Sequence, residues 1–253
     1  MIDLHSHILA GVDDGARTLD ESLAIARAAV GSGVELMAAT PHVRADFPTT
    51  AETMERLVEE TRNALRAADI ELDLRGGGEV SLDFLPRLAL EELRRFGLAG
   101  NPRYVLLEFP YEGWPLGLET VVASLREEGI TVVLAHPERS ESVQVSPLQL
   151  LPVVTEGALV QLTASSLTGA GGRRARQAAD TLLERELAHL VAGDLHAPGA
   201  RSGLDAAAEA LGGGALARWL THDLPFAIAH DEPLPPRPPG RGRSRRRLGF
   251  LRG

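Results

Sequence analysis

Short apolar stretches alternate with longer amphipathic stretches along the 253-residue chain. The short ones have the length of buried strands, whereas the longer ones repeat apolar residues every three or four positions, as a helix does. Strands are predicted over Ile2–His5, Leu36–Thr40, Ile70–Arg75, Tyr104–Glu108, Thr131–His136, Ala158–Thr163 and His189–Gly193. Helices are predicted over Leu19–Gly33, Thr50–Ala68, Leu82–Phe96, Leu116–Glu128, Pro147–Glu156, Gly172–Glu186 and Gly203–Leu220.

Seven alternating strand–helix units predict an α/β fold in which helices cover parallel strands. Closed into a ring, the units make a single-domain TIM-like barrel that is one unit short of the eightfold type. An open, doubly wound sheet is the alternative, and alternation alone does not exclude it. The predicted domain covers residues 1–230. Residues 231–253 are predicted to form a flexible Pro/Arg-rich tail, because it contains five prolines between residues 233 and 239, and the segment from Arg237 onward has seven arginines and no acidic residue.

Composition narrows the class of protein. Hydrophobic residues make up 44% of the chain and charged residues 24%, which is ordinary for a soluble globular protein. We expect a cytoplasmic protein without membrane insertion, because no apolar run approaches the ~20 residues that cross a bilayer and no secretory signal is present. The net charge of −9 argues against nucleic-acid binding by the main body. The absence of cysteine excludes disulfides, thiolate metal ligands and a cysteine nucleophile, and nothing in the sequence determines the oligomeric state.

Residues with metal-binding chemistry follow six of the seven predicted strands. His5 and His7 end the first strand, where residues two apart point the same way and can reach one ion. The full set is His5, His7, Asp14, His42, Glu79, Glu108, His136, Asp194 and His196. Each residue taken alone is more simply a hydrogen-bonded or turn residue. The carboxyl ends of parallel strands, however, meet at one edge of the sheet. So many ionisable groups buried together there need partners of opposite charge, which metal ions can supply. The pattern therefore predicts a metal centre, and the remaining three histidines are expected to be ordinary helix or surface residues.

The charge count indicates a phosphate substrate. Four of these residues are carboxylates, so two divalent ions would balance them and three would leave a positive surplus suited to a phosphate dianion. Arg139 follows His136 and Arg201 follows His196, and both could bind phosphate oxygens in a bidentate manner. A surface ion pair is the alternative role for each arginine.

Several segments resemble the PHP (polymerase and histidinol phosphatase) superfamily and, within it, the bacterial manganese-dependent tyrosine-protein phosphatases of capsular and exopolysaccharide gene clusters. The matching segments are Met1–Gly15, Ala39–His42, Gly77–Val80, Leu106–Pro110, Leu134–Arg139, Gln161–Gly169 and Gly193–His196. The resemblance implies a distorted seven-stranded barrel with three metal ions. The first would be held by His5, His7, Glu79 and Asp194, the second by Glu79, Glu108 and His136, and the third by Asp14, His42 and His196, with Arg139 and Arg201 binding phosphate.

The same resemblance implies Mn²⁺ as the metal, although the mixed carboxylate and imidazole donors also suit Fe or Zn. It implies as substrate the phosphotyrosine tail of a bacterial tyrosine kinase that controls polysaccharide export. A water activated by the metals would attack phosphorus, and the phenolate leaving group, whose conjugate acid has a pKa of about 10, needs little acid assistance. The alternatives are a small-molecule phosphoesterase of the histidinol-phosphate phosphatase kind, a nuclease or proofreading module, and a non-catalytic regulator that binds a kinase.

Overall fold

Strands occur wherever the hydrophobic pattern predicts them, and two short additional strands continue two of these. The structure is a computed structural model that describes residues 1–197 and 203–239. Within these residues the strands are β1 (Ile2–Asp3), β2 (Leu36–Ala39), β3 (His42–Val43), β4 (Asp73–Gly76), β5 (Glu79–Ser81), β6 (Tyr104–Glu108), β7 (Thr131–Leu134), β8 (Leu159–Thr163) and β9 (Leu190–Ala192). All pairs between these strands are parallel, so the predicted strand–helix alternation in a parallel α/β fold is confirmed.

The strands form two hydrogen-bonded sets, β1-β2-β4 and β3-β5-β6-β7-β8-β9. The sets are linked by the chain itself, because β2 leads into β3 through Thr40-Pro41 and β4 leads into β5 through Gly77-Gly78. A parallel bridge between Ser6 and Leu195 then connects the segment after β1 to the segment after β9. Its hydrogen bonds run from the His7 amide to the Leu195 carbonyl oxygen and from the Asp194 amide to the His5 carbonyl oxygen, both at 2.9 Å. The parallel sheet is therefore strongly curled.

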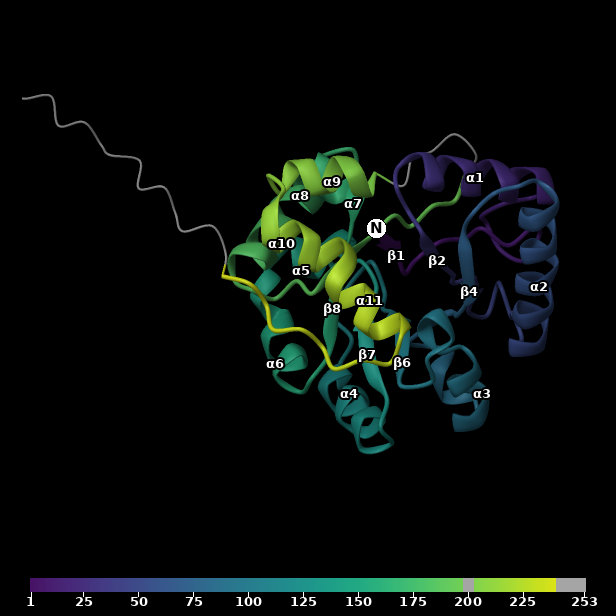
Figure 1. The fold of residues 1–253 in the computed structure, drawn as a ribbon. Coiled ribbons are helices and arrows are strands. Elements are labelled where there is room, and N and C mark those ends of the chain that lie inside the picture. Colours follow the sequence, from purple (N-terminus) through teal and green to yellow (C-terminus); the bar gives the residue numbers. More distant parts are fainter. Residues whose placement is uncertain (198–202, 240–253) are drawn as a thin grey trace, which may run out of the picture.

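Helices surround the strands. They are α1 (Leu19–Gly31), α2 (Ala51–Ala67), α3 (Leu90–Arg95), α4 (Leu118–Glu127), α5 (Glu141–Val145), α6 (Leu150–Thr155), α7 (Ala164–Thr168), α8 (Arg173–Glu184), α9 (Leu204–Ala210), α10 (Gly214–Arg218) and α11 (Leu224–Ala229). Single turns lie at Leu85–Arg87, Leu98–Gly100, Pro137–Arg139 and Pro147–Gln149, and a π-helical turn at Trp219–Asp223 joins α10 to α11. Figure 1 shows α1 and α2 on one side of the strands and α5, α6, α8 and α9 on the other.

The longer helices begin and end as their sequences predict. Thr18 precedes α1 and its side chain accepts a hydrogen bond from the Glu21 amide, while Thr50 caps α2 in the same way. The helix α2 packs against α1 and β4, and the core continues to strands β6 and β8, whose residues are all buried. Because the strands are buried on both faces, their sequences read as continuous apolar runs rather than as alternating ones.

Three predicted elements differ from the structure. The single helix predicted over Leu82–Phe96 is wrong, because extended backbone at Leu88 (ψ 133°) separates the turn that contains Pro86 from α3. The helix predicted over Gly203–Leu220 is divided at Gly212-Gly213-Gly214, where φ is 77°, 63° and 80°. The third strand begins at Asp73 rather than Ile70, since the Ile70 amide instead closes the end of α2 by donating to the Leu65 carbonyl oxygen at 3.0 Å.

The first residues of the predicted tail lie against the domain. Trp219 donates its indole N–H to the Pro235 carbonyl oxygen at 3.0 Å, and the Arg237 guanidinium lies 5.3 Å from the centre of the same indole. Arg237 also donates to the Ala188 carbonyl oxygen. Residues 240–253 lie outside the described part of the chain, so the domain boundary and the flexible tail stay predictions.

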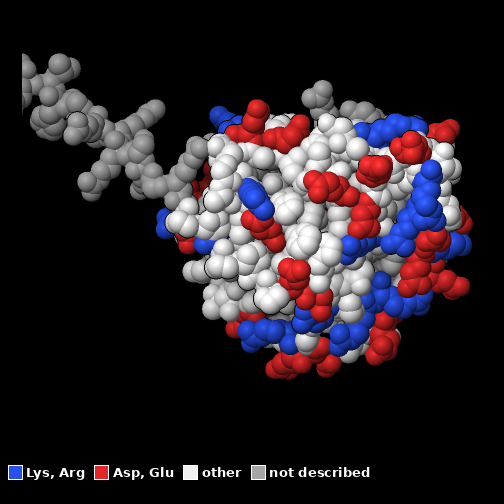
Figure 2. Space-filling view, in the orientation of Figure 1, with Lys and Arg blue, Asp and Glu red and all other residues white. Residues whose placement is uncertain are grey.

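The described surface carries mixed charge. Figure 2 shows acidic and basic side chains interspersed on one face of the molecule, mostly over α1 to α4. Among the described residues, no helix combines the length and the apolar character that a membrane span requires.

Candidate metal centre

All nine residues predicted to bind metal are brought together at the carboxyl ends of the strands. Their ligand atoms form four overlapping groups, within each of which the atoms lie no more than 4.8 Å apart. The groups are His7, Asp14, His42 and His196; His5, Glu79 and His136; His5, His7 and Asp194; and His42, Glu79 and Glu108. Seven of the nine residues line one polar cup of about 230 Å³, and His5 and His7 contact two of these lining residues, Glu79 and Asp194.

Glu79 is the central carboxylate of this cup. It begins β5, and its side chain is fully buried. One oxygen, Oε1, lies 2.9 Å from His136 Nε2, and the other, Oε2, lies 2.9 Å from His42 Nδ1. Oε2 is also 3.4 Å from the Nε2 atoms of both His5 and His7. Glu79 therefore belongs to two of the four groups of ligand atoms.

Asp194 completes the group around the first strand. Its Oδ1 atom lies 3.3 Å from His5 Nε2 and 3.4 Å from His7 Nε2, and the two imidazole nitrogens are 3.2 Å apart. Both histidines point to the same side because they alternate along an extended segment. Three donors from two chain segments therefore converge on one point.

Asp14 lies on the more open side of the cup. Its Oδ1 atom is 3.4 Å from His42 Nε2 and 3.5 Å from His196 Nε2. The Asp14 side chain is 48% exposed, whereas that of Glu108, on the other side of His42, is 8% exposed. The cup thus has a solvent-accessible mouth and a buried floor.

Several buried oxygen and nitrogen atoms in the cup have no hydrogen-bond partner. Within the described part of the chain they include Glu79 Oε2, Glu108 Oε1, Asp194 Oδ1 and His42 Nδ1. Leaving such atoms unsatisfied is costly, and cations compensate carboxylates and imidazoles together. The donor set therefore fits divalent metal ions.

Arg139 lies at the rim of the cup. Its Nη1 atom donates to Asp194 Oδ2 at 2.6 Å, and its guanidinium is 5.2 Å from the centre of the Tyr111 ring. Tyr111 in turn stacks on the His136 imidazole, with 5.8 Å between ring centres and 9° between planes. Arg201, the second predicted phosphate ligand, lies outside the described residues.

Comparisons with known proteins show the family to which the chain belongs. The family model described as "Capsular polysaccharide synthesis, CpsB/CapC" matches residues 1–211. This chain belongs to the CpsB/CapC family. It is 33% identical over 203 residues to the tyrosine-protein phosphatase YwqE of Bacillus subtilis, covering 78% of this chain and 77% of that protein. It is 30% identical over 199 residues to the putative tyrosine-protein phosphatase CapC of Staphylococcus aureus, with the same shares covered.

A solved structure is also similar to this CpsB/CapC-family protein. It comes from a study of YwqE from Bacillus subtilis and CpsB from Streptococcus pneumoniae, described as unique metal-dependent tyrosine phosphatases. The TM-score is 0.83 at 29% sequence identity, and the match covers 95% of this chain and all of that chain. The predicted single-domain α/β fold and the resemblance to tyrosine-protein phosphatases of capsular gene clusters are thereby confirmed.

Interactions between charged side chains determine the pKa values in the cup of this CpsB/CapC-family protein. Burial alone would lower the pKa of His5, but the negative charges of Glu79 and Asp194 outweigh it and raise this pKa to about 9. Burial acts against the charge on Glu79, yet the charge of His5, the hydrogen bond with His136 and the close contact with His42 hold the pKa of this carboxyl well below its usual range. Glu108 differs, because burial and the charge of Glu79 both raise its pKa. Cations entering the cup would compete with the protons on these imidazoles.

A second layer of residues orients the histidines, and sequence reasoning did not assign them this role. His7 Nδ1 lies 2.8 Å from Asp13 Oδ2, and His5 Nδ1 lies 2.9 Å from Gln161 Oε1. Both contacts leave the opposite ring nitrogen, Nε2, directed into the cup. The adjacent aspartates in the Val12–Gly15 segment were the signal for Asp13. Gln161 is the middle residue of β8, the one strand predicted without an ionisable ligand at its end.

The backbone around the cup needs two unusual features. A Cβ atom on Gly15 would lie only 2.1 Å from the His7 carbonyl oxygen, so the loop can fold back onto the first strand only with glycine there. His136 and Asp194 have positive φ angles, 32° and 52°. Such conformations cost roughly 1–3 kcal/mol each and concentrate at functional sites. The three histidines expected to be ordinary, His189, His222 and His230, belong to none of the four groups within the described residues.

Proposed function

We propose that this CpsB/CapC-family protein is a metal-dependent protein-tyrosine phosphatase that acts in bacterial polysaccharide synthesis. The observation that carries the proposal is the convergence of nine carboxylate and imidazole side chains in four overlapping groups at the cup, with an arginine on its rim. Relatives at about 30% identity carry the name tyrosine-protein phosphatase, which supports the same reaction. The absence of cysteine excludes the thiolate route to phosphotyrosine hydrolysis.

The proposed cation arrangement has three sites. His5, His7, Glu79 and Asp194 would hold the first ion, and Glu79, Glu108 and His136 the second. Asp14, His42 and His196 would hold the third. The grouping of ligand atoms supports this division, because His5, His7 and Asp194 form one group and Asp14, His42 and His196 belong to another.

Manganese is the proposed metal. Four carboxylates and five imidazoles make a mixed oxygen and nitrogen donor set, without the thiolates that favour zinc or copper(I). Iron and zinc suit the same donors, so the metal has to be determined by analysis of the purified protein.

The chain's own residues supply substrate binding. Divalent cations bound in the cup supply Lewis acidity, which activates water and stabilises negative charge on phosphoryl oxygens. Arg139 presents a planar guanidinium at the same rim, and its fork of N–H donors matches two phosphoryl oxygens. Arg201 is proposed as its counterpart. The phenolate of tyrosine leaves without a strong general acid, because the pKa of its conjugate acid is about 10.

We also propose that the two strand sets form one distorted seven-unit barrel of the PHP type. The chain links β2 with β3 and β4 with β5, so the nine described strands reduce to seven strand units. The Ser6–Leu195 bridge supports closure between the first and last units.

The proposed substrate is the phosphotyrosine tail of a bacterial tyrosine kinase, met in the cytoplasm. The relation of the family to capsular polysaccharide synthesis supports this setting. The open mouth beside Asp14 supports a flexible segment as substrate, since such a segment can reach a recessed cup.

The test uses the full chain, stripped of metal with a chelator and analysed for residual metal. We expect hydrolysis of p-nitrophenyl phosphate and of a phosphotyrosyl peptide to disappear and to return with Mn²⁺, with Fe²⁺ and Zn²⁺ assayed in parallel. Undiminished hydrolysis after verified metal removal would refute the proposal.

A second assay separates protein from small-molecule substrates. The Mn²⁺-loaded protein is compared on a phosphotyrosyl peptide and on histidinol phosphate. We expect a higher kcat/KM for the peptide, whereas the opposite preference would indicate a small-molecule phosphoesterase. A double variant, H136A with D194A, is expected to abolish both activities, and retained activity would exclude the cup as the active site.

A further inference from the structure

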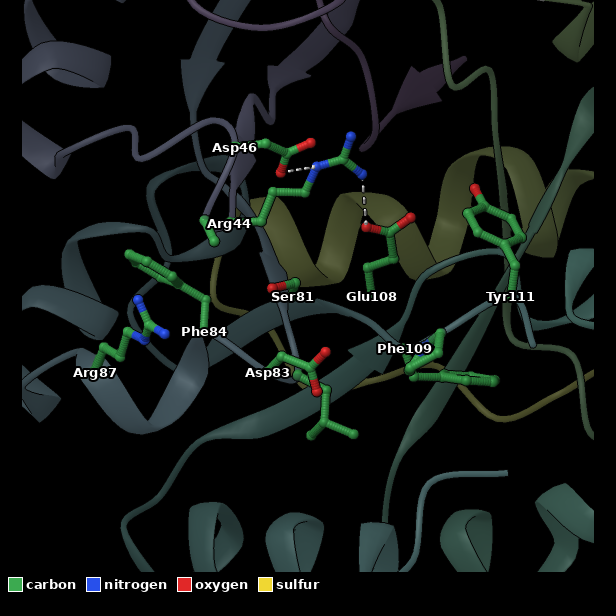
Figure 3. A pocket seen from close by; sticks show the side chains of 12 residues that line it. Arg44, Asp46, Ser81, Asp83, Phe84, Arg87, Glu108, Phe109 and Tyr111 are labelled. Atoms are coloured by element: carbon green, nitrogen blue, oxygen red, sulfur yellow. Dashed lines mark ion pairs between the residues drawn. The ribbon is translucent and has the colours of Figure 1, made fainter. Parts of the chain in front are cut away.

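A cleft adjoins the metal cup on the side of β3, β5 and β6. It has a volume of about 400 Å³ and is lined by the loops that follow these three strands. Arg44, Glu108 and Tyr111 line both the cleft and the cup, so the two spaces share a rim. Figure 3 shows Arg44 and Tyr111 on this rim and Phe84 beside Arg87 at one side of the view.

The cup and the cleft differ in chemistry. All ten residues that line the cup are ionisable, and they offer little apolar surface besides the Tyr111 ring. The cleft adds apolar groups, namely Leu82, Phe84, Phe109 and Pro110. A phosphoryl group fits the cup, whereas the peptide chain that carries it finds apolar contacts in the cleft.

The two arginines of the cleft are in different electrostatic situations. Arg44 Nε lies 2.9 Å from Asp46 Oδ1 and Arg44 Nη1 lies 3.6 Å from Glu108 Oε2, so two carboxylates already balance its charge. Arg87 is exposed, and its guanidinium lies 5.5 Å from the centre of the Phe84 ring. Within residues 1–197 and 203–239, Arg87 forms no ion pair with a carboxylate.

Stacking on Phe84 orders the guanidinium while its N–H donors stay available. An arginine held in this way presents a fork that binds a carboxylate or a phosphate. Asp83, which also lines the cleft, is exposed and forms no ion pair among the described residues. The cleft therefore combines an apolar wall with one unpaired cation and one unpaired carboxylate, next to the space where the phosphoryl group would bind.

We propose that this cleft is a second substrate subsite, in which Arg87 on Phe84 binds an anionic side chain close to the phosphotyrosine of the substrate peptide. The proposal rests on the proposed phosphatase function, and it makes Arg87 a specificity residue for phosphopeptides. The anionic group is a carboxylate from Asp or Glu or the phosphate of a second phosphotyrosine.

The experiment uses the Mn²⁺-loaded full chain and synthetic peptides with one central phosphotyrosine. Glu is moved through the three positions on each side, and each peptide has a Gln counterpart. A further pair carries a second phosphotyrosine or a tyrosine at the preferred position. We expect Glu at one position to raise kcat/KM about three- to tenfold over Gln, the range of one favourable, partly exposed ion pair.

The variant R87A is expected to reduce this Glu-to-Gln ratio to about one. The matched control is R56A, which removes an exposed arginine on α2 that pairs with Glu60 and lies outside the cleft. We expect R56A to keep the full ratio. Thermal unfolding followed by circular dichroism shows whether R87A is folded, and the charge reversal R87E is expected to prefer peptides with Lys at the same position.

Binding is measured independently of turnover with phosphonate analogues of the peptides by fluorescence anisotropy. We expect the same Glu-to-Gln ratios for the binding affinities.

Two results would overturn the subsite proposal while the proposed function stands. In both, p-nitrophenyl phosphate and phosphopeptides are hydrolysed, but either no position shows a preference for Glu or the preference persists in R87A. A preference of the wild type for peptides with Lys, which Asp46 and Asp83 would attract, also overturns the subsite proposal. Failure to hydrolyse any phosphotyrosyl substrate instead refutes the function. A larger ratio for the doubly phosphorylated pair than for the Glu pair identifies phosphate as the anion, and the reverse identifies carboxylate.

Discussion

Replacing Asp13 by Asn tests whether the second layer of the cup controls metal binding. The Asp13 carboxylate accepts three hydrogen bonds, from His7 Nδ1 at 2.8 Å, from the Gly15 amide at 2.9 Å and from the His42 amide at 3.0 Å. Two of these reach the same oxygen, Oδ2, and the side chain is fully buried. Asn carries only one acceptor oxygen, so D13N keeps either the Gly15 contact or the two contacts at Oδ2, but not all three.

The magnitude follows from these contacts. Loss of a carboxylate partner behind a metal-binding histidine typically lowers metal affinity about 10- to 100-fold, which corresponds to roughly 1.4–2.8 kcal/mol. Asp13 contacts His7 directly and His42 through its backbone, so the group of His7, Asp14, His42 and His196 is affected at two members. In metal-free protein the lost hydrogen bonds are expected to lower the free energy of unfolding by about 1–3 kcal/mol.

Mn²⁺ affinity is measured by competition with a chromophoric chelator, and the free energy of unfolding by urea titration in the presence of EDTA. The matched control is D69N, because Asp69 is exposed, lies outside the metal groups, and has a φ of 54° that Asn tolerates. We expect wild-type affinity in D69N and a weakened complex in D13N.

Two results would contradict this reasoning. If Mn²⁺ binds D13N within twofold of the wild type, the orientation of His7 by Asp13 does not contribute to the metal centre. If affinity is unchanged but the protein is less stable, Asp13 serves only to fasten the loop before Gly15.

Three further outcomes are expected. Burial and the positive charge of Arg237 lower the pKa of His189 from the ordinary 6.5 to about 4. Between pH 6.5 and 4 the unfolded chain therefore binds more protons than the folded protein. The free energy of unfolding is expected to fall by up to about 3 kcal/mol as the pH drops through this range. The variant H189N should flatten that part of the urea-unfolding profile in metal-free protein between pH 7.5 and 4.5, and an unchanged slope argues against this assignment. G15A should lose about 3 kcal/mol of stability, because its Cβ would lie 2.1 Å from the His7 carbonyl oxygen. The control G31A has open space around the new methyl group and should stay within about 1 kcal/mol of the wild type. Thermal unfolding measures both variants. R139A should lower kcat/KM for a phosphotyrosyl peptide about 10²- to 10³-fold with R139K in between, and near-normal turnover of R139A would remove this arginine from phosphate binding.

Local periodicity predicted the elements well where a single rule operates. The strand over Tyr104–Glu108 has the predicted bounds, and the capped helix after Thr50 differs by one residue at each end. The long helices predicted over Leu82–Phe96 and Gly203–Leu220 failed where a proline turn and a run of three glycines with positive φ interrupt the pattern. Their apolar residues still reach the core, which is why periodicity alone did not reveal the interruptions.

The candidate site was predicted from residue type and position at strand ends, and all nine residues do meet in one set of overlapping ligand groups. Asp13 was not predicted, although the pair of adjacent aspartates was a signal for it, because the sequence does not show which of the two faces a histidine. Tyr111 was not predicted because a ring that packs on a histidine carries no distinctive spacing. Arg139 was expected to face phosphate, and the structure adds its hydrogen bond to Asp194, a contact between residues 55 positions apart.

The sequence by itself determined which residues could form buried strands and which donors stand at their ends, because both are properties of a few neighbouring positions. It also carried the resemblance to a phosphatase family. Only the tertiary structure decided that Glu79 lies among four imidazoles, that Asp3 near the first strand accepts a hydrogen bond from Gly193 near the last, and that a cleft with Arg87 opens beside the cup. These relations depend on the curvature of the whole parallel sheet, which arises from packing among distant segments and has no local signature in the chain.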